Sequence, residues 1–340
     1  MKILAIYGTR PEYIKIKPII EKCSNIKSLF VKQHTDIINF GNYDFSLDIQ
    51  NACSSRLNSI FSEILLKLGE ILKDFDAVLI QGDTATVMAT ALVAFNLKKK
   101  IFYLESGLRT FDFDNPFPEE GYRQMVSRIA DINFCPTQLS ADNLKNENVK
   151  GSIYVVGNTC LDNIVEYRDK TSYSDKILIT LHRNENLNKI KDWLIKIEEA
   201  SFSNPNLKFI FPIHPNPIIK EACIGIKNII FTDPLSHKDL LDLMKDCLFV
   251  ITDSGGIQEE ACFLNKKVIV CRETTERPEG IYSGHIKVCK SPINFLNIFN
   301  DCLNNYSINS ECPYGDGKSS IKVIEILKNK IYKKNLTAFF

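Results

Sequence analysis

The sequence predicts an α/β protein built from two doubly wound, Rossmann-like domains, and three observations support this. Apolar runs of strand length alternate with stretches of helix length along most of the chain. Such alternation is typical of parallel sheets covered by helices on both faces. Polar turns containing glycine follow several of the runs, as at Gly8-Thr9-Arg10 and Ser254-Gly255-Gly256. The length of 340 residues fits two domains, each able to bury its own core.

The first domain is expected to span residues 1–168. Its strands are predicted as short apolar runs at 3–7, 77–80, 101–104, 132–135 and 153–156. Helices are expected at 11–23, 57–75 and 85–97, and another begins at Glu119. Residues 31–53 are polar and aromatic, and Gln33 and His34 within them either line a cleft or belong to a plain loop.

The second domain is expected to span residues 169–317, with the polar stretch 166–175 as the linker. Strands are predicted at 177–181, 209–213, 229–231, 247–251 and 267–271, and helices at 188–201, 236–246 and 257–261. A last amphipathic helix covers about 318–334, and we expect residues 318–340 to pack on the first domain. Ligands of open parallel sheets bind beyond the carboxyl ends of the strands, which favours an active site in the cleft between the domains.

Composition excludes several classes of function. The hydrophobic content of 44%, the charged content of 24% and the net charge of +1 describe an ordinary globular protein. A near-neutral balance argues against nucleic acid or a membrane surface as the main partner. No signal-peptide pattern opens the chain, and no apolar run approaches the roughly 20 residues of a membrane span. The eleven cysteines form no CxxC pair and mostly lie in apolar runs, so we expect a reducing, cytoplasmic setting.

Three carboxylates follow strands or precede helices of the first domain. Asp83, Glu105 and Glu119 all fall on loops expected at one edge of the sheet. Carboxylates that converge on one rim repel one another, which raises their pKa values and suits general acid and base catalysis. The plainer interpretation of Asp83 is a helix N-cap.

The stretch around Ser254 has the features of an anion site. Ser254, Gly255 and Gly256 separate a buried strand from a helix, where unpaired N–H groups and the helix dipole attract a phosphate. Glu260, one turn later, suits ribose hydroxyls, and Arg277 belongs to a charged cluster after the next strand. An ordinary strand–helix turn is the alternative.

Two cations and two histidines also lie near the ends of predicted strands. Arg10 and Lys15 flank the start of the first helix and suit either an anion or the surface. His182 and His214 each follow a strand, and His182 has the better claim to function. No cluster has metal-ligand spacing, and no GxGxxG or Walker lysine motif is present, so neither a metal nor a bound NAD or ATP is indicated.

Ten motifs in order give the chain a family resemblance. They are GTRPE at 8–12, GDT at 82–84, ESGLRT at 105–110, PFPEE at 116–120, GNT at 157–159, LHRNEN at 181–186, HPNP at 214–217, TDSGGIQEEA at 252–261, ETTERPE at 273–279 and PYGDG at 313–317. Together they resemble the non-hydrolysing UDP-N-acetylglucosamine 2-epimerases, which have a two-domain, glycosyltransferase-B-like fold.

The resemblance implies an activity and roles for individual residues. Members of that family interconvert UDP-N-acetylglucosamine (UDP-GlcNAc) and UDP-N-acetylmannosamine (UDP-ManNAc). They do so by anti elimination of UDP to 2-acetamidoglucal and syn re-addition, without a cofactor, as homodimers that supply cell-surface polysaccharide synthesis. The matching acid, base and histidine positions are Asp83, Glu105, Glu119 and His182. The matching nucleotide-binding positions are Arg10, Lys15, Ser254, Gly256, Glu260 and Arg277.

The chain also departs from the family pattern. Gln33, His34 and His214 match remnants of an allosteric substrate site, but Thr35 stands where that loop carries arginine, so activation by substrate is not predicted. Alternatives within the class are a hydrolysing 2-epimerase and a 2-epimerase of a modified UDP-N-acetylhexosamine. The alternative from another class is a UDP-sugar glycosyltransferase, against which the three carboxylates argue.

Overall fold

The computed structural model describes residues 1–33, 43–50 and 55–337, which form two compact units. Unit 1 comprises residues 1–163 and the C-terminal segment from residue 315, and unit 2 comprises residues 164–314. The boundaries expected from the sequence, after residues 168 and 317, fall slightly later in the chain.

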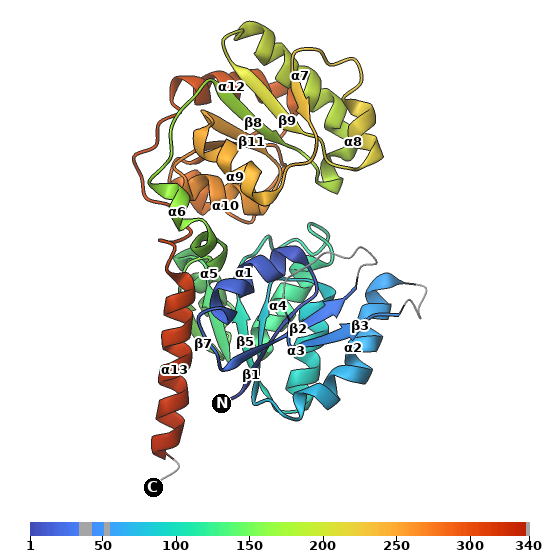
Figure 1. Ribbon diagram of the computed structural model, residues 1–340, viewed down its shortest axis with the longest axis vertical. Helices are drawn as coiled ribbons and strands as arrows, with labels where there is room; N and C mark the ends of the chain where they lie inside the picture. Colours follow the sequence, from blue (N-terminus) through green and yellow to red (C-terminus); the bar gives the residue numbers. More distant parts are fainter. Residues whose placement is uncertain (34–42, 51–54, 338–340) are drawn as a thin grey trace. The chain divides into compact units, whose positions relative to one another are not determined.

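Unit 1 is built on a parallel sheet of seven described strands in the order β3-β2-β1-β4-β5-β6-β7 (Figure 1). The strands are β1 Ile3–Tyr7, β2 Ile26–Lys32, β3 Phe45–Asp48, β4 Ala77–Gln81, β5 Lys100–Leu104, β6 Ile132–Cys135 and β7 Ser152–Val155. The helices are α1 Arg10–Ile20, α2 Arg56–Leu72, α3 Ala85–Asn96, α4 Glu119–Ile129, α5 Gln138–Asn146 and α13 Ser319–Thr337, with a 3₁₀ turn, η1, at Thr159–Asn163.

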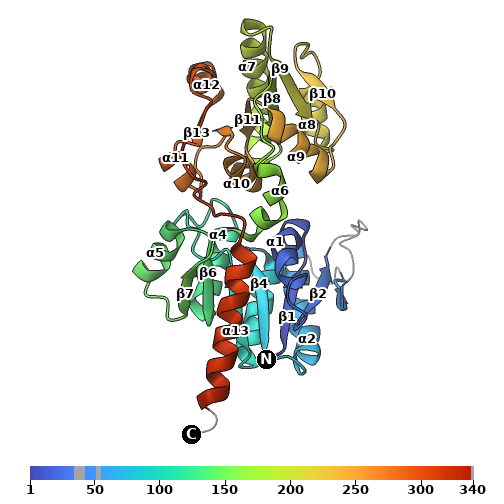
Figure 2. The same ribbon diagram turned by 60° about the vertical axis from the view of Figure 1, so that its left-hand side comes forward.

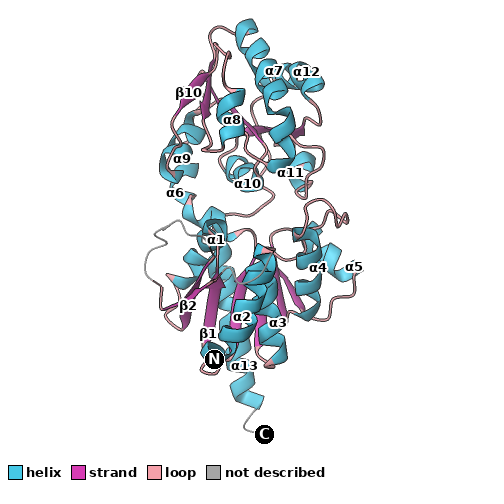
Figure 3. Cartoon of the chain, turned by 90° about the vertical axis from the view of Figure 1, so that its right-hand side faces the viewer, coloured by secondary structure: helices cyan, strands magenta, loops and turns pink. Residues whose placement is uncertain are grey.

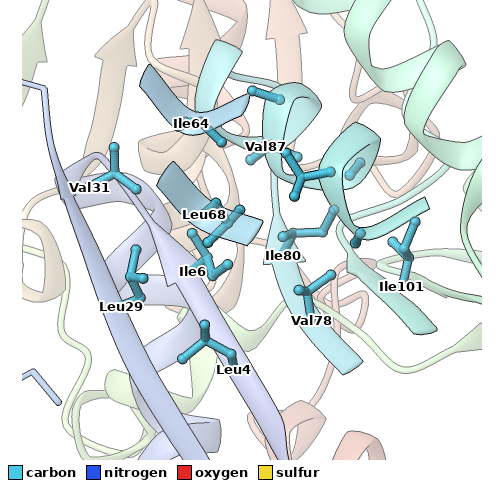
Figure 4. Close-up of a cluster of buried hydrophobic side chains, with 14 of the residues drawn as sticks. Leu4, Ile6, Leu29, Val31, Ile64, Leu68, Val78, Ile80, Val87 and Ile101 are labelled. Atoms are coloured by element: carbon cyan, nitrogen blue, oxygen red, sulfur yellow. The ribbon is translucent and has the colours of Figure 1, made fainter. Parts of the chain in front are cut away.

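Two apolar layers enclose this sheet. On one face, α2 and α3 pack on the strands (Figure 3), and Figure 4 shows Ile64 and Leu68 of α2 beside Ile6 and Ile80. On the other face, α1 and α13 bury Ile16 and other residues against the same strands. Strands buried on both faces read as continuous apolar runs, which is why most of them were predictable from the sequence.

The C-terminal helix α13 is a component of unit 1, where it runs along the sheet (Figure 2). Val323, Ile324 and Leu327 lie in the core layer with α1. Asp162 accepts hydrogen bonds from the backbone N–H groups of Ser319 (3.0 Å) and Ser320 (2.7 Å). A carboxylate at a helix N-terminus satisfies its unpaired donors and favours its dipole.

Unit 2 contains a parallel sheet of six described strands in the order β10-β9-β8-β11-β12-β13. The strands are β8 Lys176–Thr180, β9 Lys208–Pro212, β10 Ile230–Thr232, β11 Phe249–Thr252, β12 Lys267–Val270 and β13 Ile286–Val288. The helices are α6 Val165–Arg168, α7 Ile190–Ser203, α8 Pro217–Ala222, α9 His237–Asp246, α10 Gly255–Phe263, α11 Glu279–Tyr282 and α12 Phe295–Asn304; 3₁₀ turns η2 and η3 span Asn184–Lys189 and Pro292–Asn294. Two parallel sheets interleaved with helices confirm the predicted α/β class.

Several elements differ from the sequence expectations. The stretch 166–175 is not a free linker, because Arg168 stacks on the Phe263 ring at 4.9 Å and the Tyr173 hydroxyl donates to the carbonyl of Asn265. Strands β2, β3 and β13 and helices α5, α8, α11 and α12 were not predicted. Helix α12 is rich in asparagine, a weak helix former, but Phe295 and Phe299 bury it in the core. Within the part of the chain that the structure describes, no helix has the length and apolar character that a membrane span requires.

Candidate active site

The carboxyl ends of β4 and β5 carry two of the predicted catalytic acids. The strands pair with Gln81 opposite Leu104, so the loops that follow them leave the same edge of the unit 1 sheet. Glu105 directly follows β5 and has a φ of +58°, in the left-handed region that non-glycine residues seldom adopt. Such strained backbone is concentrated at functional sites. The structure therefore brings Asp83 and Glu105 to one edge of the sheet.

Glu105 is held by three side chains from other elements of unit 1. Lys15 Nζ lies 2.5 Å from both carboxylate oxygens, and the two side chains are 12% and 7% exposed. The Gln81 amide donates to the same carboxylate, and Asn158 Nδ2 donates to Oε1 at 3.3 Å. Lys15, placed by the sequence among the nucleotide-binding residues, thus also contacts a predicted catalytic acid.

Asp83 is paired with an arginine that the sequence analysis missed. Arg123 Nε and Nη2 lie 3.1 and 2.5 Å from Asp83 Oδ2. Arg123 Nη1 also donates to Glu120 Oε2 at 3.3 Å, and Glu120 accepts the N–H groups of Thr110 and Phe111. Helix α4 and the loop before it are therefore tied to the turn that carries Asp83.

The sequence predicted carboxylates that repel one another, but in the structure two of them are paired with cations. Lys15 contacts Glu105 and Arg123 contacts Asp83, so each of these two acids has a cation at hydrogen-bond distance. Glu119 is the first residue of α4 and is half-buried. The residue spacing gave no sign of these cations, because their carboxylates lie 90 and 40 positions away in the chain.

The start of α1 is fixed by a capping box. Thr9 is the N-cap, and its hydroxyl accepts from the backbone N–H of Glu12. Glu12 in turn accepts from the N–H groups of Gly8 (2.6 Å) and Thr9 (3.1 Å) and from the Thr84 hydroxyl (2.6 Å). Burial raises the pKa of Glu12, against the lowering effect of these donors. Arg10, the first residue of α1, is exposed at this fixed helix terminus.

In unit 2, the predicted anion site is the N-terminus of α10. Ser254 is the N-cap and the helix begins at Gly255, two residues earlier than expected, so the glycines form its first turn. A Cβ at Gly255 would lie 2.6 Å from Arg277 Nη1, whereas one at Gly256 would meet nothing within 4 Å. Glycine at 255 thus admits the guanidinium, and Gly256 leaves the helix terminus open.

Charged side chains surround this helix terminus. Arg277 Nε donates to Glu259 Oε1 at 2.6 Å, and its Nη1 donates to Glu276. Arg272 joins Glu276 (3.0 Å) to Glu185 (2.6 Å) in the loop after β8. Arg277 is buried in this network, so its guanidinium is oriented before any ligand binds.

Glu260 has a partner that the sequence reasoning did not find. His237 Nε2, at the start of α9, lies 2.9 Å from Glu260 Oε1. The carboxylate expected to face a ribose is therefore shared with an imidazole.

His182 follows β8 and lies against two other residues. Its backbone N–H donates to both carboxylate oxygens of Asp253, at 3.1 and 3.0 Å. Its ring stacks on that of His214, with centroids 5.5 Å apart and planes 13° from parallel. Burial lowers the pKa of His182 below its usual 6.5, Asp253 raises it, and Arg183 and His214 lower it further.

The predicted allosteric remnants fall in different places. Gln33 contacts the Thr86 hydroxyl in unit 1 (3.2 Å), His34 lies outside the described residues, and His214 stacks on His182 in unit 2. Among the described residues no group of histidine, cysteine, aspartate or glutamate is arranged to hold a metal.

The chain is similar to proteins of known family over nearly its full length. The family model described as UDP-N-acetylglucosamine 2-epimerase matches residues 19–328. The UDP-N-acetylglucosamine 2-epimerase of Campylobacter jejuni is 36% identical over 377 residues, covering 96% of this chain and 97% of that protein.

Solved structures extend this likeness. The UDP-GlcNAc 2-epimerase of Neisseria meningitidis bound to UDP-GlcNAc has a TM-score of 0.87 and 32% identity, covering 97% of this chain and 100% of that chain. The Methanocaldococcus jannaschii enzyme in complex with UDP-GlcNAc and UDP has a TM-score of 0.80 and 32% identity, with coverage of 97% and 100%. These likenesses confirm the predicted fold class, two doubly wound domains of the glycosyltransferase-B type.

Proposed function

This chain belongs to the UDP-N-acetylglucosamine 2-epimerase family, and we propose that it interconverts UDP-GlcNAc and UDP-ManNAc without releasing free sugar. The observation that carries the proposal is the pair of carboxylates, Asp83 and Glu105, each fixed by a cation at adjacent strand ends. Inverting C2 of the sugar requires a proton to leave one face of that carbon and arrive on the other, and positioned carboxylates are suited to such transfers.

The proposed reaction has two halves. In the first, a base takes the proton from C2, the C–H electrons form the C1–C2 double bond, and UDP leaves C1 with the bonding pair. The product is 2-acetamidoglucal. In the second, a UDP oxygen bonds to C1 and a proton is delivered to the opposite face of C2. We assign Asp83, Glu105, Glu119 and His182 to these proton transfers and to the charge that develops on the leaving group.

We assign the nucleotide to the N-terminus of α10. Ser254, Gly255 and Gly256 supply N–H groups and the positive end of the helix dipole. Further nucleotide-binding assignments go to Arg10, Lys15, Glu260 and Arg277. Retaining UDP after the first half is essential, because a cleaved intermediate that escaped could not be re-joined.

The direct test is a proton NMR time course of the protein with UDP-GlcNAc in D2O. We expect UDP-ManNAc carrying deuterium at C2 and no free sugar. Free N-acetylmannosamine with UDP would replace the proposal with a hydrolysing 2-epimerase. Binding of UDP-GlcNAc without reaction would reject this substrate in favour of a modified UDP-sugar or a transferase.

Substitutions separate the catalytic from the nucleotide-binding roles. We expect Asp83→Asn, Glu105→Gln and His182→Asn to abolish turnover while UDP affinity, measured by calorimetry, stays near that of the wild type. Asp142→Asn is the matched control, because Asp142 lies exposed on α5 beside Lys145. Loss of UDP affinity in all three variants would contradict the catalytic assignment.

Two further parts of the proposal follow from family membership. We propose a homodimer, which light scattering after gel filtration measures directly. We also propose that UDP-ManNAc from this enzyme supplies cell-surface polysaccharide synthesis.

A further inference from the structure

Asp253 has a carboxylate wholly buried in unit 2, directly after β11 and immediately before Ser254. Its side chain accepts the backbone N–H groups of His182 (3.1 and 3.0 Å) and Arg183 (2.9 Å) and the side-chain amide of Asn186 (3.0 Å). All of these donors come from the loop that follows β8. One carboxylate therefore holds the first turn of that loop.

The neighbouring strands place Asp253 where it can do this. β8 and β11 pair in parallel with Thr180 opposite Thr252, and the backbone N–H of Asp253 donates to the carbonyl of Thr180 at 3.2 Å. The chain leaving β8 at His182 thus passes beside the residue that leaves β11. Asn186 adds a second link, because its amide also donates to the carbonyl of Cys271 (2.8 Å), just after β12.

The imidazole of His182 is held by its surroundings as well as by its backbone. His182 Nδ1 lies 3.8 Å from Asp253 Oδ1, which is beyond hydrogen-bond distance but close enough for strong charge interaction. The His214 ring stacks on the His182 ring. The charged and titratable groups that act on His182 are therefore Asp253, Arg183 and His214.

We propose that Asp253 is a positioning residue for His182: by binding the N–H groups of His182 and Arg183 it sets the place of the imidazole, and its charge stabilises the protonated ring. This inference rests on the proposed function only in taking His182 as part of the catalytic machinery. Asp253 does not contact the substrate in this scheme and acts through His182.

The competing interpretation is that Asp253 only stabilises the loop after β8 and has no effect on His182 itself. This interpretation predicts different results. A carboxylate that only anchored the loop would affect folding and UDP binding together, with no specific effect on the titration of His182. A positioning residue changes the placement and charge of one imidazole. A misplacement of about 1 Å is enough to cost on the order of 100-fold in rate.

The first experiment uses Asp253→Asn in the full-length protein. An amide has one acceptor oxygen where the carboxylate has two, and its NH₂ group would face the N–H donors of the loop. We expect kcat for UDP-GlcNAc to fall by about 100-fold, with the Kd for UDP close to wild type. The thermal unfolding temperature should fall as well, because buried N–H donors of the loop lose an acceptor. The matched control is Asp301→Asn. Asp301 lies on α12 and forms an exposed ion pair with Lys287 of β13, so its loss should leave all three quantities unchanged.

The second experiment measures the pKa of His182 by NMR of protein labelled with ¹⁵N in its histidines, with His182→Asn identifying the signal. We expect Asp253→Asn to lower this pKa, because a negative charge that favours the imidazolium is lost. Asp301→Asn should not move it. This readout needs no activity, so it tests the coupling even if UDP-GlcNAc proves not to be the substrate.

A second variant completes the test. Asp253→Glu keeps the charge but moves it by one methylene, so kcat should fall without a lowered pKa of His182. This variant also serves if the Asn variant does not fold. An unchanged pKa of His182 in Asp253→Asn, or wild-type kcat in Asp253→Glu, would each overturn the proposal.

Discussion

Replacing Glu12 by alanine tests the reasoning about how unit 1 positions its site. Glu12 is 2% exposed and joins two turns, because it binds the N–H groups of Gly8 and Thr9 after β1 and the Thr84 hydroxyl after β4. Those turns carry Arg10 and Asp83. Glu12→Ala removes all three hydrogen bonds and leaves their donors without an acceptor.

The size of the effect follows from the burial of each donor. A buried donor left without a partner costs about 1–3 kcal/mol, and loss of a helix cap costs about 0.5–2 kcal/mol. Gly8 is buried, whereas Thr9 and Thr84 are half-buried and regain part of their hydrogen bonding from water. We therefore expect a destabilisation of about 3 kcal/mol, near the full cost for Gly8 and a fraction for the other two.

Two measurements test this prediction. Thermal unfolding reports the stability of the whole domain, and amide hydrogen exchange reports the local stability of the Gly8–Thr9 turn. In a domain of 150–250 residues each kcal/mol lowers Tm by roughly 2–4 °C, so we expect a fall of about 6–12 °C, with faster exchange at Gly8 and Thr9. Glu21→Ala is the matched control in the same chain segment, because Glu21 is exposed and pairs with Lys17 only at 3.7 Å. A Tm change no larger than that of Glu21→Ala would refute the argument.

Two further predictions concern single residues. Burial lowers the pKa of His285 to about 4, so the unfolded chain binds a proton at a higher pH than the folded one. The stability linked to His285 is therefore present above pH about 6.5 and is lost as the pH falls toward 4. His285→Gln should make thermal unfolding less sensitive to acid in this window, and an equal Tm difference between the two proteins at pH 7.5 and pH 5 would contradict this. Gly107→Ala should destabilise by about 1–3 kcal/mol more than Gly225→Ala, the usual cost of overpacking. Both glycines have positive φ (+92° and +85°), but a Cβ at Gly107 would collide with the carbonyl of Ser140, whereas one at Gly225 meets nothing within 4 Å. Similar urea midpoints for the two variants would show that backbone strain alone sets the cost.

Strand ends were predictable from the sequence, but the partners of the residues on them were not. The continuous apolar runs of β4 and β5 identify them as buried parallel strands, and this places Asp83 and Glu105 at one edge of the sheet. Arg123 could not be assigned to Asp83, because a charged residue on a helix reads as a surface residue until the fold brings it against its acid.

Two further features could not be established from the sequence: an edge strand and the roles of the predicted catalytic residues. β3 has only Leu47 buried, so no apolar run marks it. The roles of Asp83, Glu105, Glu119 and His182 stay predictions, since they depend on where a substrate binds.

Glu12 and Asp253 have the same structural role, because each carboxylate binds backbone N–H groups of a chain that leaves a parallel strand. A chain that leaves a parallel strand exposes backbone N–H groups, and a carboxylate can accept several of them at once because it has two oxygens and a full charge. Glu12 lies four positions from Gly8, so its capping box is readable from local sequence. Asp253 lies 71 positions from His182, and only the pairing of β8 with β11 joins them.

The longer connection joins two candidate functional residues of unit 2, His182 and Ser254. Asp253 holds the loop of His182 with its side chain and continues through its backbone into Ser254, the N-cap of α10. A phosphate bound at this helix terminus would contact the residue next to the one that fixes the histidine. In the proposed scheme the Asp253 side chain fixes the His182 loop, and only its backbone leads into the nucleotide site. For this reason Asp253→Asn should affect His182 more than the Kd for UDP.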